Sequence, residues 1–102
     1  MEQAALSTEY VKVPVAAVVN GAVFNPTVDT VQMAFPVRGA TPVSGDWKAA
    51  SWETITGAYY ARCLVGPTGG TIALVVGIYD VWVKVTDSPE VPARRAGQVT
   101  IY

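Results

Sequence analysis

The run from Gly77 to Asp87 alternates apolar and polar side chains. Its apolar positions recur every second residue and are Tyr79, Val81, Val83 and Val85. This period of two predicts a β-strand, with the valines on one face and Trp82 on the other. If the valine face is the core, Trp82 points outward and is available to a partner. If the reverse holds, Trp82 is the core anchor.

Similar alternation predicts further strands along the chain. Residues 10–15 form one of them, and Pro14 makes it an edge strand because proline cannot donate to a ladder. Residues 30–37 form another, with four apolar side chains on one face, namely Val31, Met33, Phe35 and Val37. Asn20-Gly21 and Thr56-Gly57 are turn signals between strands. The remaining expected strands are residues 47–54, 59–65, 71–75 and 98–102.

These elements predict one all-β domain. The length of 102 residues fits a single domain. Residues 1–9 lack a clear period and are expected to form a short N-terminal arm, so the domain spans residues 10–102. About seven antiparallel strands at this spacing are typical of an immunoglobulin-like (Ig-like) β-sandwich. No stretch keeps a helical period, so we expect at most one turn of helix.

A structural motif lies at the start of the strand that begins at Gly77. Leu74, Gly77 and Tyr79 resemble the tyrosine corner of Greek-key sandwiches, in which a phenol hydroxyl bonds back to the preceding loop. The favoured interpretation of Tyr79 is therefore structural.

Composition narrows the classes of partner. Apolar residues make up 51% of the chain and charged residues 15%. This low charge suggests a surface partly covered by protein neighbours. The apolar runs are too short to cross a bilayer, and the first residues lack the pattern of a secretion signal, so we expect no membrane partner and synthesis in a cytoplasm. Basic residues are scattered apart from Arg94-Arg95, which argues against nucleic acid.

Residues for catalysis or metal binding are scarce. The chain has no histidine and one cysteine, Cys63, so the commonest general base and the usual metal ligands are missing. Cys63 is interpreted as a small buried hydrophobe. Asp87 and Glu90 could touch a calcium ion, although a solvated loop is favoured. We therefore expect no enzyme, no metal and no cofactor.

Two tryptophans support a different hypothesis. Trp47 and Trp52 are five residues apart and lie on opposite faces of a regular strand, unless a bulge intervenes near residues 49–50. One of them should be core. Exposed together beside a groove, they could bind a sugar, but the chain is poor in the polar side chains that such a site needs.

Several segments together resemble a known group of proteins. The resemblance covers nearly the whole chain from Tyr10 and is carried by Tyr10–Val15, Asn20-Gly21, Asp29–Phe35, Trp47–Trp52, Tyr60–Arg62 and Gly77–Asp87. These segments look like small Ig-like virion structural proteins of tailed bacteriophages, particularly those infecting actinobacteria. The Gly-x-Tyr-x-Val-x-Val element also occurs in bacterial surface Ig-like repeats and in baseplate proteins.

The resemblance implies a non-enzymatic structural protein of the virion, made in the host cytoplasm. The leading interpretation is a capsid decoration protein that bridges major capsid subunits and is a homo-oligomer in the particle. The residues expected to contact partners are Met1, Leu6, Tyr10, Trp82, Arg94 and Arg95. One alternative is a ring component of the head-to-tail connector or tail. Another is a small module that binds a glycan or a host surface.

Overall fold

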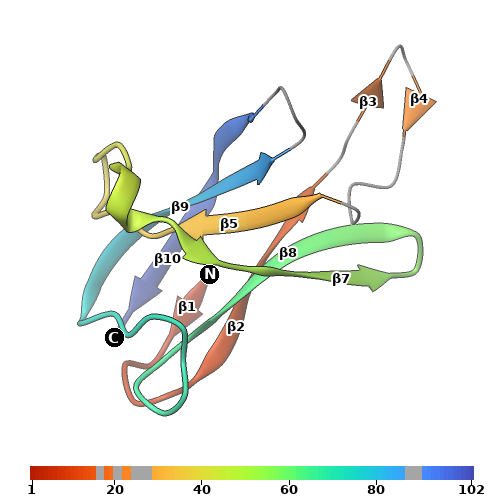
Figure 1. Cartoon of the computed structure of the whole chain (residues 1–102). Helices are drawn as coiled ribbons and strands as arrows, with labels where there is room; N and C mark the ends of the chain where they lie inside the picture. Colours follow the sequence, from red (N-terminus) through yellow and green to blue (C-terminus); the bar gives the residue numbers. More distant parts are fainter. Residues whose placement is uncertain (16–17, 20–21, 24–28, 87–90) are drawn as a thin grey trace.

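Two β-sheets pack face to face in the computed structural model (Figure 1). The structure describes residues 1–15, 18–19, 22–23, 29–86 and 91–102. The five-stranded sheet has the order β1-β10-β9-β5-β6, and the three-stranded sheet has the order β2-β8-β7. Strands β3 and β4 form a separate hairpin. The fold is therefore all-β and sandwich-like, as predicted.

The strand bounds follow the chain order. The five-stranded sheet comprises β1 (Glu2–Gln3), β5 (Thr30–Ala34), β6 (Lys48–Ala49), β9 (Gly77–Thr86) and β10 (Ala93–Ile101). The other strands are β2 (Glu9–Val15), β3 (Val18–Val19), β4 (Ala22–Val23), β7 (Ser51–Ile55) and β8 (Ala58–Val65). About seven strands were expected, and the described residues contain ten, of which four are two residues long. One 3₁₀ turn, Ser44–Asp46, interrupts the loop after β5.

Strand β9 is the centre of the larger sheet and confirms the predicted alternation. It pairs antiparallel with β10 on one side and with β5 on the other. Tyr79, Val81 and Val83 are buried and Val85 is partly buried against the same core. Trp82 therefore lies on the outer face of the sheet, because neighbouring side chains of a strand point to opposite faces.

The smaller sheet also follows its sequence signals. Strand β2 is an edge strand that contains Pro14, and its Val11 and Val13 are buried. Strands β7 and β8 form a hairpin across Thr56 and Gly57, whose φ angles of 46° and 77° are both positive. Two successive positive φ angles are typical of the tight turn that matches the twist of a hairpin.

The N-terminal segment differs from the expected arm, because part of it belongs to the sheet. Strand β1 pairs in parallel with the end of β10. The amide of Gln3 donates 2.7 Å to the Val65 carbonyl and 3.1 Å to the Ser7 carbonyl. The next loop lies against Gly66, where an added Cβ would overlap Thr8. This segment therefore packs on the domain rather than extending from it.

The prediction of one strand at residues 47–54 is wrong, because the chain passes from one sheet to the other within this segment. Strand β6 pairs with β5 in the larger sheet, whereas β7 pairs with β8 in the smaller sheet. Ala50 lies between the two strands, and its amide bonds to the Val31 carbonyl at 3.2 Å. A bulge was considered at this place, and a crossing between sheets is found instead.

Other strand boundaries also differ from those predicted. Val37 was expected on the core face, but it is 61% exposed; β5 ends at Ala34, and Val37 keeps only an isolated bridge to Tyr79. Residues 71–75 form only an isolated bridge, between Ile72 and Val65. The last strand begins at Ala93 instead of residue 98. Strands β3 and β4 confirm a hairpin around Asn20-Gly21, although that turn itself lies outside the described residues, as do Asp87 and Glu90.

Candidate partner-binding site

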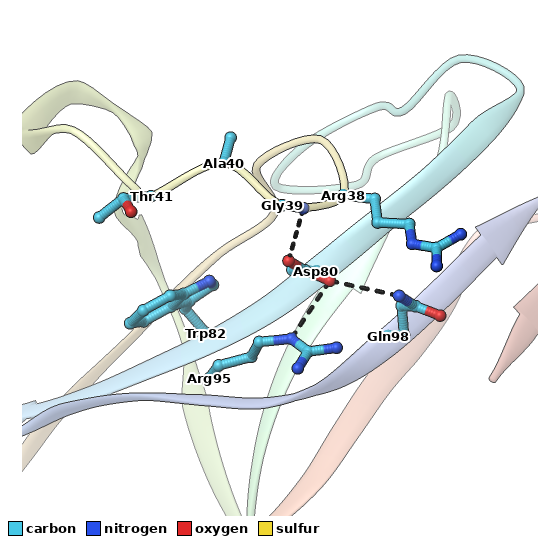
Figure 2. Close-up of a pocket in the computed structure, with 8 residues that line it drawn as sticks. All are labelled: Arg38, Gly39, Ala40, Thr41, Asp80, Trp82, Arg95 and Gln98. Atoms are coloured by element: carbon cyan, nitrogen blue, oxygen red, sulfur yellow. Dashed lines mark hydrogen bonds and ion pairs between the residues drawn. The ribbon is translucent and has the colours of Figure 1, made fainter.

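A depression of about 350 Å³ lies on the outer face of the five-stranded sheet (Figure 2). Strand β9 provides its floor with Asp80 and Trp82, which are two residues apart and therefore share a face. The complete lining is Arg38, Gly39, Ala40, Thr41, Asp80, Trp82, Arg95 and Gln98. The site thus combines side chains from two neighbouring strands and from the loop that follows β5.

A bulge in β10 brings two polar side chains to this face. Arg95 is opposite Trp82 and Gln98 is opposite Asp80, and the register shifts between Arg95 and Gly97. In a regular strand, residues three apart point to opposite faces. The extra residue of the bulge, Ala96, puts Arg95 and Gln98 on the same side, since a bulge redirects the side chains around it.

The loop after β5 forms the second wall because its backbone is tied to β9. Arg38 donates its amide to the Ile78 carbonyl at 3.1 Å, and Asp80 donates its amide to the Pro36 carbonyl at 2.9 Å. Gly39 has a φ of 84°, a left-handed conformation that favours glycine. Its amide points at Asp80. The loop is thus fixed to the sheet by contacts on both sides of its turn.

Asp80 is the electrostatic centre of the site. Its Oδ2 accepts a 2.9 Å hydrogen bond from the Gly39 amide. Its Oδ1 accepts a 3.4 Å bond from Gln98 and lies 3.3 Å from Nε of Arg95. The Gly39 amide, followed by Gln98 and Arg95, lowers the pKa of Asp80 below its usual value, although burial of the carboxylate acts in the opposite direction.

Trp82 is half-buried beside this carboxylate and is paired across the sheet with the buried Ala34. Its indole N–H is buried and has no hydrogen-bond partner among the described residues. A buried donor without an acceptor costs about 1–3 kcal/mol. A ligand that offered a hydrogen-bond acceptor to this N–H would therefore gain binding free energy.

The structure brings two of the six expected partner-contact residues together, Trp82 and Arg95. Arg94 is exposed but lies outside the depression. Tyr10 is on the outer face of the other sheet, where the guanidinium of Arg62 lies 4.2 Å above its ring. Met1 and Leu6 belong to the N-terminal segment, and both are exposed. The six residues therefore do not form one continuous contact surface.

Trp47 and Trp52 do not form a shared platform. Trp52 packs against the core from β7, and its indole N–H donates 2.8 Å to the Asp29 carbonyl. Trp47 precedes β6, and Nζ of Lys84 lies 4.5 Å above its ring. Trp52 belongs to the smaller sheet, whereas Trp47 lies just before β6 of the larger sheet, so the arrangement gives no support to a sugar site between them.

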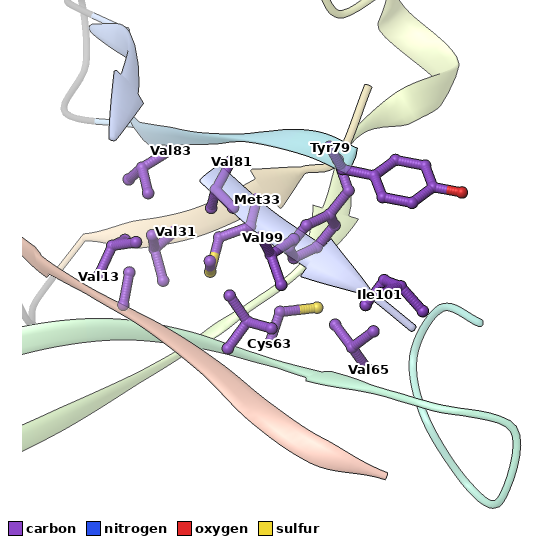
Figure 3. Close-up of a cluster of buried hydrophobic side chains, with 13 residues drawn as sticks. Val13, Val31, Met33, Cys63, Val65, Tyr79, Val81, Val83, Val99 and Ile101 are labelled. Carbon is purple, nitrogen blue, oxygen red and sulfur yellow. The ribbon is translucent and has the colours of Figure 1, made fainter. Parts of the chain in front are cut away.

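The residues predicted to be structural lie in the core (Figure 3). Those that are fully part of it are Val31, Met33, Phe35, Tyr79, Val81 and Val83. The Tyr79 hydroxyl donates 2.9 Å to the Val75 carbonyl, which confirms the predicted tyrosine corner. Cys63 is buried as predicted, and burial raises the pKa of its thiol.

Six of the eight lining residues were not predicted from the sequence to contact a partner, among them Arg38, Asp80 and Gln98. Asp80 shares the outward period with Trp82, and this signal could have paired them. Arg38 and Gln98 carried no such signal, because the folded loop and the bulge in β10 position them.

An apolar region lies at one end of the sandwich. Its exposed side chains are those of Leu6, Val75, Val76 and Tyr102, with Leu6 92% exposed and Val76 69% exposed. We call these four residues the apolar end. Backbone pairing joins its segments, since the Ala5 amide donates to the Tyr102 carbonyl at 2.6 Å and Ile101 pairs with Gly77. In Figure 1 the loop before β2 and the segment before β9 meet near the C-terminus.

Metal sites, membrane-spanning helices and related proteins were also sought. No group of three or more acidic, cysteine or histidine side chains is placed there to hold a metal ion. No helix among those residues is long and apolar enough to span a membrane. No family model matches the chain, and no curated protein or solved structure matches it significantly.

Proposed function

We propose that this protein is a non-enzymatic structural component of a bacteriophage virion, and that it decorates the capsid by bridging major capsid subunits. The observation that carries the proposal is the apolar end, where large exposed side chains gather on three neighbouring segments. Contiguous groups of exposed apolar side chains mark sites of protein contact. The low charge of the chain supports the same conclusion.

The proposed fold type is Ig-like. Strands β2, β7 and β8 correspond to B, D and E of that fold, and β5, β9 and β10 correspond to C, F and G. Strand β1 then stands for a first strand that pairs with the last, and β6 for an extra strand beside C. The hydroxyl bond of Tyr79 near the start of β9 supports this correspondence, because Ig-like domains place a tyrosine corner there.

The contact surface we propose joins the apolar end to the depression. Ile78 lies between them on the outer face of β9, and its side chain is exposed. Leu6, Trp82 and Arg95 are the expected contact residues that this surface contains. A rigid sandwich with one such surface fits a protein that bridges subunits and assembles in several copies on the particle.

Copy number tests the proposal. Purified particles would be analysed by quantitative mass spectrometry against the major capsid protein. A decoration protein follows icosahedral symmetry, which predicts on the order of hundreds of copies. A ring in the connector or tail predicts about six or twelve copies. Absence from particles would contradict both virion roles and leave a binding module for a host surface.

A further inference from the structure

We propose that the depression on the five-stranded sheet binds a carboxylate, supplied by an aspartate or glutamate side chain of a partner protein. Arg38 and Arg95 are the residues that hold it. That the carboxylate comes from a partner protein rests on the function proposed above. Binding of the carboxylate itself is a property of the isolated domain.

The charges of the site favour one more negative group. Two guanidinium groups, of Arg38 and Arg95, line the depression together with one carboxylate, Asp80. The lining therefore carries a net formal charge of +1. The oxygens of Asp80 already accept from Gly39, Gln98 and Arg95. Asp80 is thus satisfied, and one positive charge remains to be matched.

The unused donors lie on both sides of Asp80 (Figure 2). Arg95 uses its Nε for Asp80, and its two terminal amino groups have no hydrogen-bond partner among the described residues. Arg38 forms no ion pair with any described residue. A guanidinium presents parallel N–H groups that match the two oxygens of a carboxylate.

The same geometry favours a singly charged ligand. A doubly charged phosphate would face the ionised Asp80, and like charges at close range repel. A carboxylate side chain carries one charge, which equals the excess in the lining. Its carbon chain can pack on the indole of Trp82, and the depression of about 350 Å³ is large enough to admit it.

The first experiment uses the isolated domain and follows the indole N–H signals of its three tryptophans by NMR. The probes are a blocked Gly-Glu-Gly peptide, a blocked Gly-Gln-Gly peptide and inorganic phosphate, at equal ionic strength. We expect the glutamate peptide to move the Trp82 signal saturably. Trp52 is an internal control, since its N–H is already bonded to Asp29.

Two variants distinguish binding in the depression from nonspecific attraction between opposite charges. Arg38→Gln should weaken binding of the glutamate peptide by at least about tenfold, which corresponds to one lost charged contact. Arg94→Gln removes the same charge one residue before Arg95 but outside the depression, and should leave binding unchanged. Dispersed spectra of both variants would show that they fold.

Three results would overturn the carboxylate site: no saturable change at Trp82, equal binding by the Arg38→Gln variant, or tighter binding of phosphate than of the glutamate peptide. Particle binding is measured separately. If the peptide binds but the domain never attaches to capsids, the site stands and the decoration function fails. If the domain attaches to capsids equally well with Arg38→Gln, the function stands and the partner carboxylate is rejected.

Discussion

Single hydrogen bonds hold the start of β9 in place. The hydroxyl of Tyr79 bonds to Val75, and the carboxylate of Asp80 binds the loop that carries Gly39. The two residues are adjacent, so one faces the core and the other the outer surface. Together they connect both sides of the larger sheet to neighbouring loops.

We predict that Tyr79→Phe lowers the free energy of unfolding by about 1 kcal/mol, because it removes one hydrogen bond while the ring keeps its packing. Urea denaturation with an unchanged m-value would measure this. Tyr102→Phe is the matched control, because Tyr102 is exposed and should give no change. Equal stability of Tyr79→Phe and the parent would refute a stabilising role for the corner.

Stability should also depend on the protonation of Asp80. Its pKa is lowered by the fold, so the carboxylate contributes fully above its unfolded pKa of about 3.9. As the pH falls below about 4 toward the folded pKa, this contribution is lost. The groups that face it are the Gly39 amide, Gln98, Arg95 and Arg38.

The test compares Asp80→Asn with the parent by urea denaturation from pH 6 down through this acidic range. The difference in unfolding free energy between the two proteins should shrink as the pH falls, because protonation removes the charge that the variant lacks. A constant difference would show that the charge of Asp80 does not stabilise the fold.

At the scale of the element, β1 and the bulged β10 decide what the sheet presents. The predicted arm is partly a strand, and its Gln3 is a buried polar side chain. The bulge in β10 puts Arg95 beside Asp80. Neither feature changes the core pattern, yet both shape the surface that the proposed partner would meet.

We predict that Gln3→Ala destabilises the domain by about 1–3 kcal/mol, because the buried Val65 carbonyl loses its donor. Glu2→Ala provides the control, since Glu2 is exposed in the same strand. Chemical denaturation of both variants measures the difference. If Gln3→Ala and a chain without residues 1–5 both unfolded at the parent's urea midpoint, β1 would be dispensable and the segment would act as an arm.

At the scale of the whole molecule, charged side chains are paired on the smaller sheet, whereas exposed apolar side chains lie at one end of the sandwich. On the smaller sheet, Glu53 pairs with both Lys12 and Arg62 at 2.9 Å. At the apolar end, Leu6 and Val76 are exposed. This asymmetry is the reason for placing the partner at that end.

The double substitution Leu6→Ser and Val76→Ser should reduce the number of copies on capsids by at least about tenfold, as loss of central apolar contacts does in other interfaces. Unfolding free energy should change by less than about 0.5 kcal/mol, because both residues are exposed. Ile55→Ser, at the β7–β8 turn far from this end in Figure 1, is the control. Parent-like occupancy of the double variant would contradict the proposed contact surface.

The sequence by itself determined the strands with a clear period of two and the direction of their side chains. The valine face of β9, the buried Cys63 and the corner at Tyr79 depend on residues close in the chain, so local patterns predicted them. The all-β, sandwich-like class followed from the spacing of such strands and of the turn signals between them.

Only the tertiary structure decided the position of β1, the crossing at Ala50, the bulge in β10 and the loop over Trp82. Each depends on contacts between distant residues: Gln3 meets Val65, 62 positions away, and Gly39 meets Asp80, 41 positions away. Local periodicity describes residues that are close in the chain. It carries no information about such pairs, because folding alone brings their two segments together. The candidate site is made of these long-range contacts, and for that reason the sequence indicated Trp82 and Arg95 but not their surroundings.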